Sequence, residues 1–168
     1  MIDSKQISSE FDRYDRKILE ILAENGRLTI TELADRIGLS KTPCQNRVRR
    51  LEKDGVIRGY RAILDPVSMG AAHIAFVEVQ LSDTREAALR AFNVAVQGLR
   101  PVESCHMIAG GFDYLLKVRT RDIASYRKFL GETLSALPNV AQTRTYVVME
   151  AVKDTGALVT ALIFRSHR

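Results

Sequence analysis

The chain has 168 residues, of which 46% are hydrophobic, and a formal net charge of +5. This hydrophobic content suits one medium domain or two small ones, so we expect most of the chain to fold. The first residues contain no apolar run of the signal-peptide type, and the late apolar stretch at 157–164 is far shorter than a membrane span, so the sequence predicts a cytoplasmic protein.

The N-terminal part of the chain predicts three closely spaced helices. Residues 11–27 have apolar side chains at helical spacing, with acids at the start. Thr29 or Thr31 can cap a short second helix. The turn at 38–40 then supplies a glycine to end that helix and a serine to cap a third helix, which runs to Asp54. Two helices joined by so short a turn form a helix-turn-helix.

The third helix has an apolar face and a polar face. Cys44, Val48 and Leu51 fall within about 60° of one another around the helix axis and form the predicted core stripe. Side chains on the opposite side can enter a DNA major groove: Arg49 can pair with guanine, and Gln45 or Asn46 can pair with adenine. The full set of predicted DNA contacts is Lys41, Thr42, Gln45, Asn46, Arg49, Arg50, Lys53 and Arg58, with Arg61 as a further backbone contact.

The charge distribution supports this assignment. Residues 41–61 contain seven basic residues and two acids, so this segment alone has an excess equal to the net charge of the whole chain. Such a basic stripe is the footprint of a surface that contacts phosphates, although a solvated helix face is the alternative interpretation.

The segment that follows predicts a change of domain. Residues 56–66 alternate and contain β-branched side chains, which favours a short strand or wing. We therefore expect a helix-turn-helix domain at 1–61, a linker at 62–71 and a second domain at 72–168.

The second domain predicts a ferredoxin-like α+β fold, because its elements follow the order βαββαβ. Gly110 and Gly111 form the turn between the two middle strands, and Pro138 breaks the last helix. A further strand at 158–164 is signalled weakly. The six main elements are strand 74–81, helix 84–99, strand 102–109, strand 114–119, helix 123–137 and strand 143–152.

Apolar residues on both faces of the predicted strands indicate self-assembly. Leu115 lies on the opposite side from its apolar neighbours, and the last strand has Val147 and Met149 opposite Tyr146 and Val148. Both helices of a βαββαβ unit cover one sheet face, so a second apolar face most simply packs against a copy of itself.

The sequence resembles one family over almost its full length. The segments LAENGRLTITELADRIGLSKTPCQNRVRRLEKDGVIRGYRAILDP, CHMIAGGFDYLLKVRTRD, SYRKFLGETLSALP and TRTYVVMEAVK occur in the order typical of the leucine-responsive, or Lrp/AsnC, family. They place the chain near the leucine-responsive branch. The resemblance implies a winged helix-turn-helix domain followed by a sensing domain.

The resemblance also implies an effector and an assembly. Family members form dimers through the sheet, join into rings such as octamers, and bind amino acids between dimers near a glycine loop. Asp113 could bind the ligand ammonium group and the loop N–H groups its carboxylate. The family pattern usually has Asp where this chain has Gly111. The residues that match the family's effector site are Gly110, Gly111, Phe112, Asp113, Tyr114, Thr143, Thr145 and Val147.

Without the family resemblance, the segment GGFDY predicts a hairpin turn followed by a buried tyrosine. Cys105 and His106 could suggest a metal site, but adjacent strand residues point to opposite faces, so we predict no metal and no cofactor. Similarly, Tyr126, Phe129 and Leu134 are expected in the core or at a dimer contact.

These observations predict a sequence-specific transcription regulator that responds to a small amino acid, with leucine and proline as candidates. An architectural DNA-binding protein that ignores ligands is the alternative. Some relatives of the same build decarboxylate tetrapyrroles, but no cluster of His, Arg and Tyr stands out here as a catalytic site. We therefore predict that the chain is not an enzyme.

Overall fold

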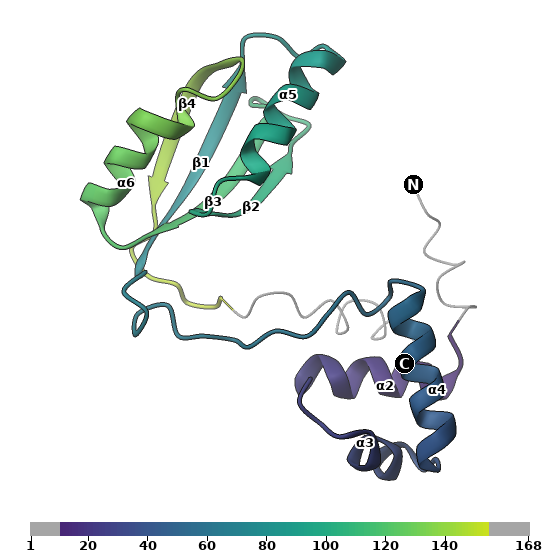
Figure 1. The fold of residues 1–168 in the computed structure, drawn as a ribbon. Helices are drawn as coiled ribbons and strands as arrows, with labels where there is room; N and C mark the ends of the chain where they lie inside the picture. Colours follow the sequence, from purple (N-terminus) through teal and green to yellow (C-terminus); the bar gives the residue numbers. More distant parts are fainter. Residues whose placement is uncertain (1–10, 155–168) are drawn as a thin grey trace. The chain divides into compact units, whose positions relative to one another are not determined.

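The computed structural model describes residues 11–154, which belong to two compact units: residues 11–63 with Asp154, and residues 64–153 (Figure 1). Each unit has its own hydrophobic core, so we describe each by itself.

The described residues of the N-terminal unit form three helices: α2 (Arg13–Glu24), α3 (Ile30–Ile37) and α4 (Lys41–Lys53). Reciprocal side-chain bonds to backbone N–H groups start the first two helices, at Asp12 for α2 and at Thr29 for α3. Gly38 ends α3 with a left-handed φ of 72°, a conformation that costs glycine little. Ser40 occupies the predicted N-cap position of α4. Its side chain makes no capping hydrogen bond, so the predicted capping interaction is wrong.

The predicted strand at 56–66 does not form, because the described residues contain no strand before β1 and this segment is irregular. An alternating pattern provides the side chains for a strand, but a strand also needs a partner to bond its backbone, and the described residues supply none. Tyr60 instead returns to the helices, where its hydroxyl donates to Oε1 of Glu52 at 3.0 Å.

The second unit confirms the ferredoxin-like prediction. Its four strands form one antiparallel sheet in the order β2-β3-β1-β4, and both helices cover the same face (Figure 1). The last helix ends in a π-helical turn rather than continuing as an α-helix to 137. The elements are β1 (His73–Leu81), α5 (Glu86–Gln97), β2 (Val102–Met107), β3 (Tyr114–Thr120), α6 (Ile123–Phe129), the π-helical turn η1 (Leu130–Leu134) and β4 (Val140–Val147).

The final strand, predicted at 143–152, begins and ends earlier than the pattern indicates. It pairs with β1 from Leu81 opposite Val140 to Ala75 opposite Val147. Because β1 begins only two residues before Ala75, little backbone remains for β4 to pair with beyond Val147. The weakly signalled strand at 158–164 lies outside the described residues.

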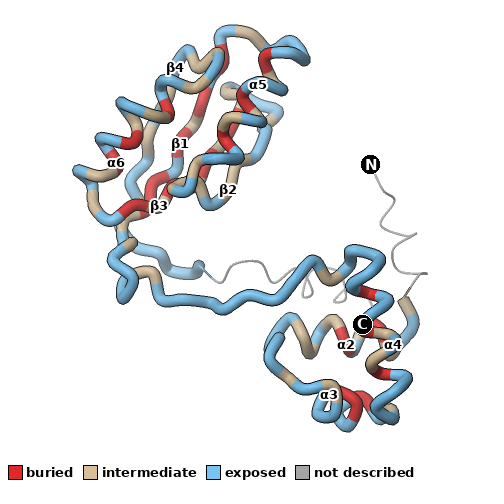
Figure 2. Tube along the Cα trace, viewed as in Figure 1, coloured by how far each residue is buried: buried red, intermediate tan, exposed pale blue. Residues whose placement is uncertain are grey.

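Alternate residues of the sheet supply the core beneath α5 and α6. Buried positions lie along the strands and in α5 and α6 (Figure 2). Val77, Leu116 and Val118 are fully buried and belong to one hydrophobic cluster with Phe92 of α5. Tyr126, Phe129 and Leu134 are also buried, which confirms that they belong to the core. The other set of alternate residues lies on the opposite side, which we call the open face. It includes Phe76, Glu78 and Tyr146.

Candidate nucleic-acid interface and ligand cleft

One face of α4 is packed and the other is open to solvent. Cys44, Val48 and Leu51 are buried against the other helices, which confirms the predicted core stripe. Gln45 is half-buried. The remaining predicted DNA contacts, Lys41, Thr42, Asn46, Arg49, Arg50, Lys53 and Arg58, are exposed.

The exposed cations of α4 differ in how they are bound. Arg49 and Lys53 form no hydrogen bond or ion pair with another residue in the described part of the chain, so their full charge is available to a ligand. Arg50 forms an ion pair with the buried carboxylate of Asp15. Arg47, which the sequence pattern did not single out, contacts both Asp12 and Asp15. Asp15 raises the pKa of Arg47 by accepting its hydrogen bond.

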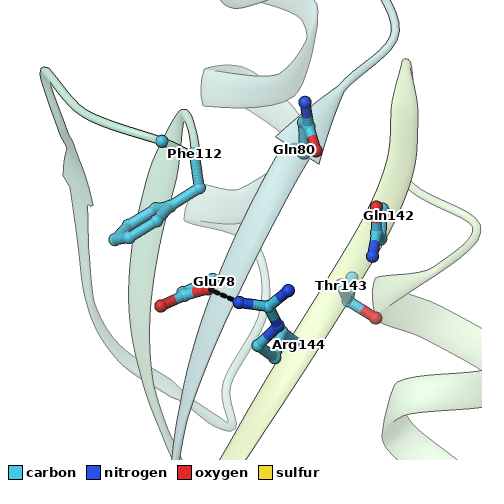
Figure 3. Close-up of a pocket in the computed structure, with 7 residues that line it drawn as sticks. Glu78, Gln80, Phe112, Gln142, Thr143 and Arg144 are labelled. Atoms are coloured by element: carbon cyan, nitrogen blue, oxygen red, sulfur yellow. Dashed lines mark ion pairs between the residues drawn. The ribbon is translucent and has the colours of Figure 1, made fainter.

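The open face of the sheet contains a cleft beside the loop between β2 and β3. Glu78 and Arg144 provide opposite charges within it, with Oε2 of Glu78 3.7 Å from Nη1 of Arg144 (Figure 3). Tyr146 donates its hydroxyl to Oε1 of Glu78 at 3.0 Å. The hydrogen bond with Tyr146 and the charge of Glu78 raise the pKa of Arg144. The cleft is lined by Glu78, Gln80, Gly111, Phe112, Gln142, Thr143 and Arg144.

The structure brings only part of the predicted effector set to this cleft. Gly111, Phe112 and Thr143 line it, although the Thr143 side chain points away from the Glu78–Arg144 pair (Figure 3). Thr145 lies on the helix side, where its hydroxyl is 2.6 Å from that of Tyr126. Val147 is two residues after Thr145 on β4 and therefore lies on the same face of the sheet. Gly110 comes directly before the lining residues Gly111 and Phe112 in the loop.

Tyr114 lies in the core, with its ring 4.4 Å from that of Phe92. It therefore adopts the buried position that the hairpin interpretation predicts. Desolvation raises the pKa of its phenol.

Glu78 and Arg144 were missed by sequence reasoning. The signal that could have identified them is the register of β1 against β4, in which these two residues are direct partners. Oppositely charged partners on adjacent strands point to the same face.

Asp113 anchors the loop to the sheet. Its Oδ2 accepts the backbone N–H of Leu81 at 2.7 Å, beside an irregularity in the pairing of β1 with β4. Its own N–H donates to the carbonyl of Val79 at 3.0 Å. The carboxylate is therefore already bonded to backbone and holds the loop next to the cleft.

Cys105 and His106 lie on opposite faces of β2, opposite Leu116 and Leu115 respectively. Burial raises the pKa of the Cys105 thiol to about 11, so it is protonated at neutral pH. The described residues contain no group of three or more side chains suited to hold a metal ion. None of the helices in this range is long and apolar enough to cross a membrane.

Known proteins share both parts of this architecture. The Lrp/AsnC ligand binding domain matches residues 74–158, and the winged helix-turn-helix DNA-binding family matches residues 11–58. A proline dehydrogenase transcriptional activator of Rhizobium radiobacter is 58% identical over 149 residues, 89% of this chain and 96% of that protein. The leucine-responsive regulatory protein of Escherichia coli strain K12 is 50% identical over 160 residues, 95% of this chain and 98% of that protein.

A solved structure gives the same result. The crystal structure of a Neisseria meningitidis transcriptional regulator in complex with L-methionine superimposes with a TM-score of 0.82 at 35% identity, covering 88% of this chain and 96% of that chain. The chain therefore belongs to the Lrp/AsnC family of transcription regulators, with a DNA-binding helix-turn-helix domain and an amino-acid-binding domain.

Proposed function

We propose that the protein is a cytoplasmic, non-enzymatic regulator that reads DNA with α4 and binds a free amino acid in the cleft beside Gly111 and Phe112. The observation that carries the ligand assignment is the pair of opposite charges, Glu78 and Arg144, in that cleft. A free amino acid carries a carboxylate and an ammonium group on one carbon, so a cation and an anion a few ångströms apart match its two charges.

Each residue then has a distinct task. Arg144 binds the ligand carboxylate, and Glu78 binds the ammonium group. Asp113 holds the loop in place through Leu81 and adds negative charge nearby. Gly111 lies in open space, where a Cβ atom would meet no atom within 4 Å, so glycine keeps the cleft wider and less negative than an acid would. Gly110, Tyr114, Thr143, Thr145 and Val147 remain predicted effector residues.

Proline is our first candidate effector and leucine the second. The supporting observation is that relatives at 58% identity are named as activators of proline dehydrogenase, whereas relatives at 50% identity are named as leucine-responsive.

A thermal-stability screen of the twenty amino acids tests this assignment. A ligand that binds only the folded protein at about 100 times its Kd adds roughly 2.7 kcal/mol of stability, so the true effector should raise Tm by several degrees. A screen in which no amino acid shifts Tm would favour the architectural DNA-binding alternative.

We further propose that the open face pairs two copies of the chain, as a step toward a larger ring such as an octamer. Phe76 and Tyr146 expose apolar rings on this face, at 38% and 46% of their surface. Replacing Phe76 with Asp places an unpaired charge in the proposed interface, which costs several kcal/mol. We expect Phe76→Asp to sediment as a folded monomer at micromolar concentration.

Val94→Asp is the matched control, because Val94 is exposed on α5, on the other side of the sheet. If Phe76→Asp and Val94→Asp associate equally well, the open face is not the interface.

Base reading by Arg49 is the test of the DNA assignment. Arg49→Ala should lose about 1–3 kcal/mol at one base position and relax the sequence preference there, because Arg49 is exposed opposite the buried stripe. Lys53→Ala should instead weaken all duplexes about equally and reduce the salt slope by about 0.9. Binding measured against single-base operator variants separates the two effects. An Arg49→Ala protein with the parent's preference at every position would show that another face of α4 reads the bases.

A further inference from the structure

Asp15 connects α2 to the cations of α4. Its side chain is only 2% exposed, and its two oxygens bind different arginines: Oδ1 lies 2.9 Å from Nη1 of Arg47, and Oδ2 lies 2.5 Å from Nη2 of Arg50. One buried carboxylate on α2 therefore fixes the position of two cations on the helix proposed to read DNA.

The two arginines differ in what they leave for another partner. Arg47 also contacts Oδ2 of Asp12 at 2.6 Å and lies over the ring of Tyr14, and its side chain is 26% exposed. Arg50 is 50% exposed, and within the described range its only charged partner is Asp15. Arg47 is thus bound to acidic residues at α2, whereas the Arg50 guanidinium keeps N–H donors that can bind another partner.

Arg50 occupies the border of the exposed face. Around α4 it lies between Lys53, which points to solvent, and Arg47, which points to α2. A guanidinium group has five N–H donors in a rigid planar fork, so it can bind a carboxylate with one amino group and a phosphate with the others. At the border of a helix in the major groove, the nearest acceptor is the phosphate backbone.

We infer that Asp15 is a positioning residue for DNA binding, which holds the Arg50 guanidinium at the edge of α4 so that it is already oriented for a phosphate. This inference rests on the proposed DNA contact by α4. A free arginine loses side-chain entropy when it is immobilised against DNA. Because Asp15 orders Arg50 in the unbound protein, that loss occurs on folding and does not weaken binding.

A double-mutant cycle tests the coupling. The probe is a duplex selected by the parent protein from a random-sequence library, and binding is measured by fluorescence anisotropy for Asp15→Asn, Arg50→Ala and the double variant. We expect Arg50→Ala to weaken binding about tenfold, because one charge-assisted hydrogen bond contributes about that factor to affinity. We expect Asp15→Asn to weaken binding several-fold alone and to add no further loss in the Arg50→Ala background.

Lys53→Ala provides the matched control cycle, since Lys53 is exposed and does not contact Asp15. The losses from Asp15→Asn and Lys53→Ala should multiply. A merely structural role for Asp15 lowers the folded fraction in every background, so its loss would also multiply in the Arg50→Ala background. That result would overturn the inference.

Arg50→Lys keeps the test decisive if Asp15→Asn does not fold. Lysine retains the charge but lacks the planar fork that binds carboxylate and phosphate together, so we expect a loss close to that of Arg50→Ala. Parent-like binding by Arg50→Lys would contradict the positioning role.

The outcomes also separate the positioning role from the DNA assignment. If Arg49→Ala, Arg50→Ala and Lys53→Ala all bind the duplex as the parent does, the DNA assignment of α4 fails as well. If Arg49→Ala and Lys53→Ala weaken binding but the Arg50 cycle is multiplicative, only the positioning role fails.

Discussion

Leu51→Ala should abolish DNA binding while leaving amino-acid binding intact. Leu51 is fully buried in the core formed by α2, α3 and α4, which is separate from the core of the sheet unit. Truncating a buried leucine to alanine costs about 2–5 kcal/mol. A unit of this size has only a few kcal/mol of stability to lose, so the three helices should unfold. Circular dichroism, anisotropy with operator DNA and calorimetry with the effector together measure this separation.

Leu116→Ala is the matched control for Leu51→Ala. Leu116 is fully buried beneath the helices of the sheet unit, so its truncation should reduce effector binding more than DNA binding. If each substitution abolished both activities to the same extent, the two units would unfold as one cooperative block, contrary to the two separate cores.

Arg144→Gln should remove the response to the amino acid and spare folding. Arg144 is exposed, and its removal frees Glu78 without creating a cavity. The substitution removes a charge-assisted hydrogen bond to the ligand carboxylate, so calorimetry should show effector affinity falling by roughly tenfold or more. Arginine stays protonated at every pH at which the protein would be assayed. The contribution of Arg144 to effector affinity should therefore be the same at pH 6 and at pH 9.

Arg90→Gln is the control for charge loss at a distance. Arg90 forms an exposed ion pair with Glu86 on α5, away from the cleft, and its removal should leave effector affinity unchanged. Equal affinity in Arg144→Gln and the parent would place the ligand carboxylate elsewhere.

Local patterns predicted the parts of the fold that depend on local interactions. The cap at Thr29, the stop at Gly38 and the buried stripe of α4 are each determined by residues a few positions apart. The order of strands and helices in the second unit followed from the same kind of pattern.

Features that depend on distant residues were not predictable in this way. The end of β4 follows from where β1 begins, and the missing strand at 56–66 follows from the lack of a strand partner among the described residues. The pairing of Arg50 with Asp15 joins residues 35 positions apart. Glu78 and Arg144 are likewise neighbours only through the register of the sheet. A sequence pattern predicts which side chains share a face of a helix or strand, but not which residues of another element they contact.

The hydrogen bond between Tyr146 and Glu78 has a thermodynamic consequence. Glu78 is the proposed partner of the ligand ammonium group, and Tyr146 is part of the surface proposed to join two copies. An ammonium group that takes a share of the Glu78 carboxylate weakens its bond to the Tyr146 hydroxyl and alters that surface. Effector binding and subunit association would then be linked, and linkage is reciprocal. Whatever factor the amino acid imposes on the dimerisation constant, dimerisation must impose on the affinity for the amino acid, so the apparent sensitivity to effector depends on protein concentration.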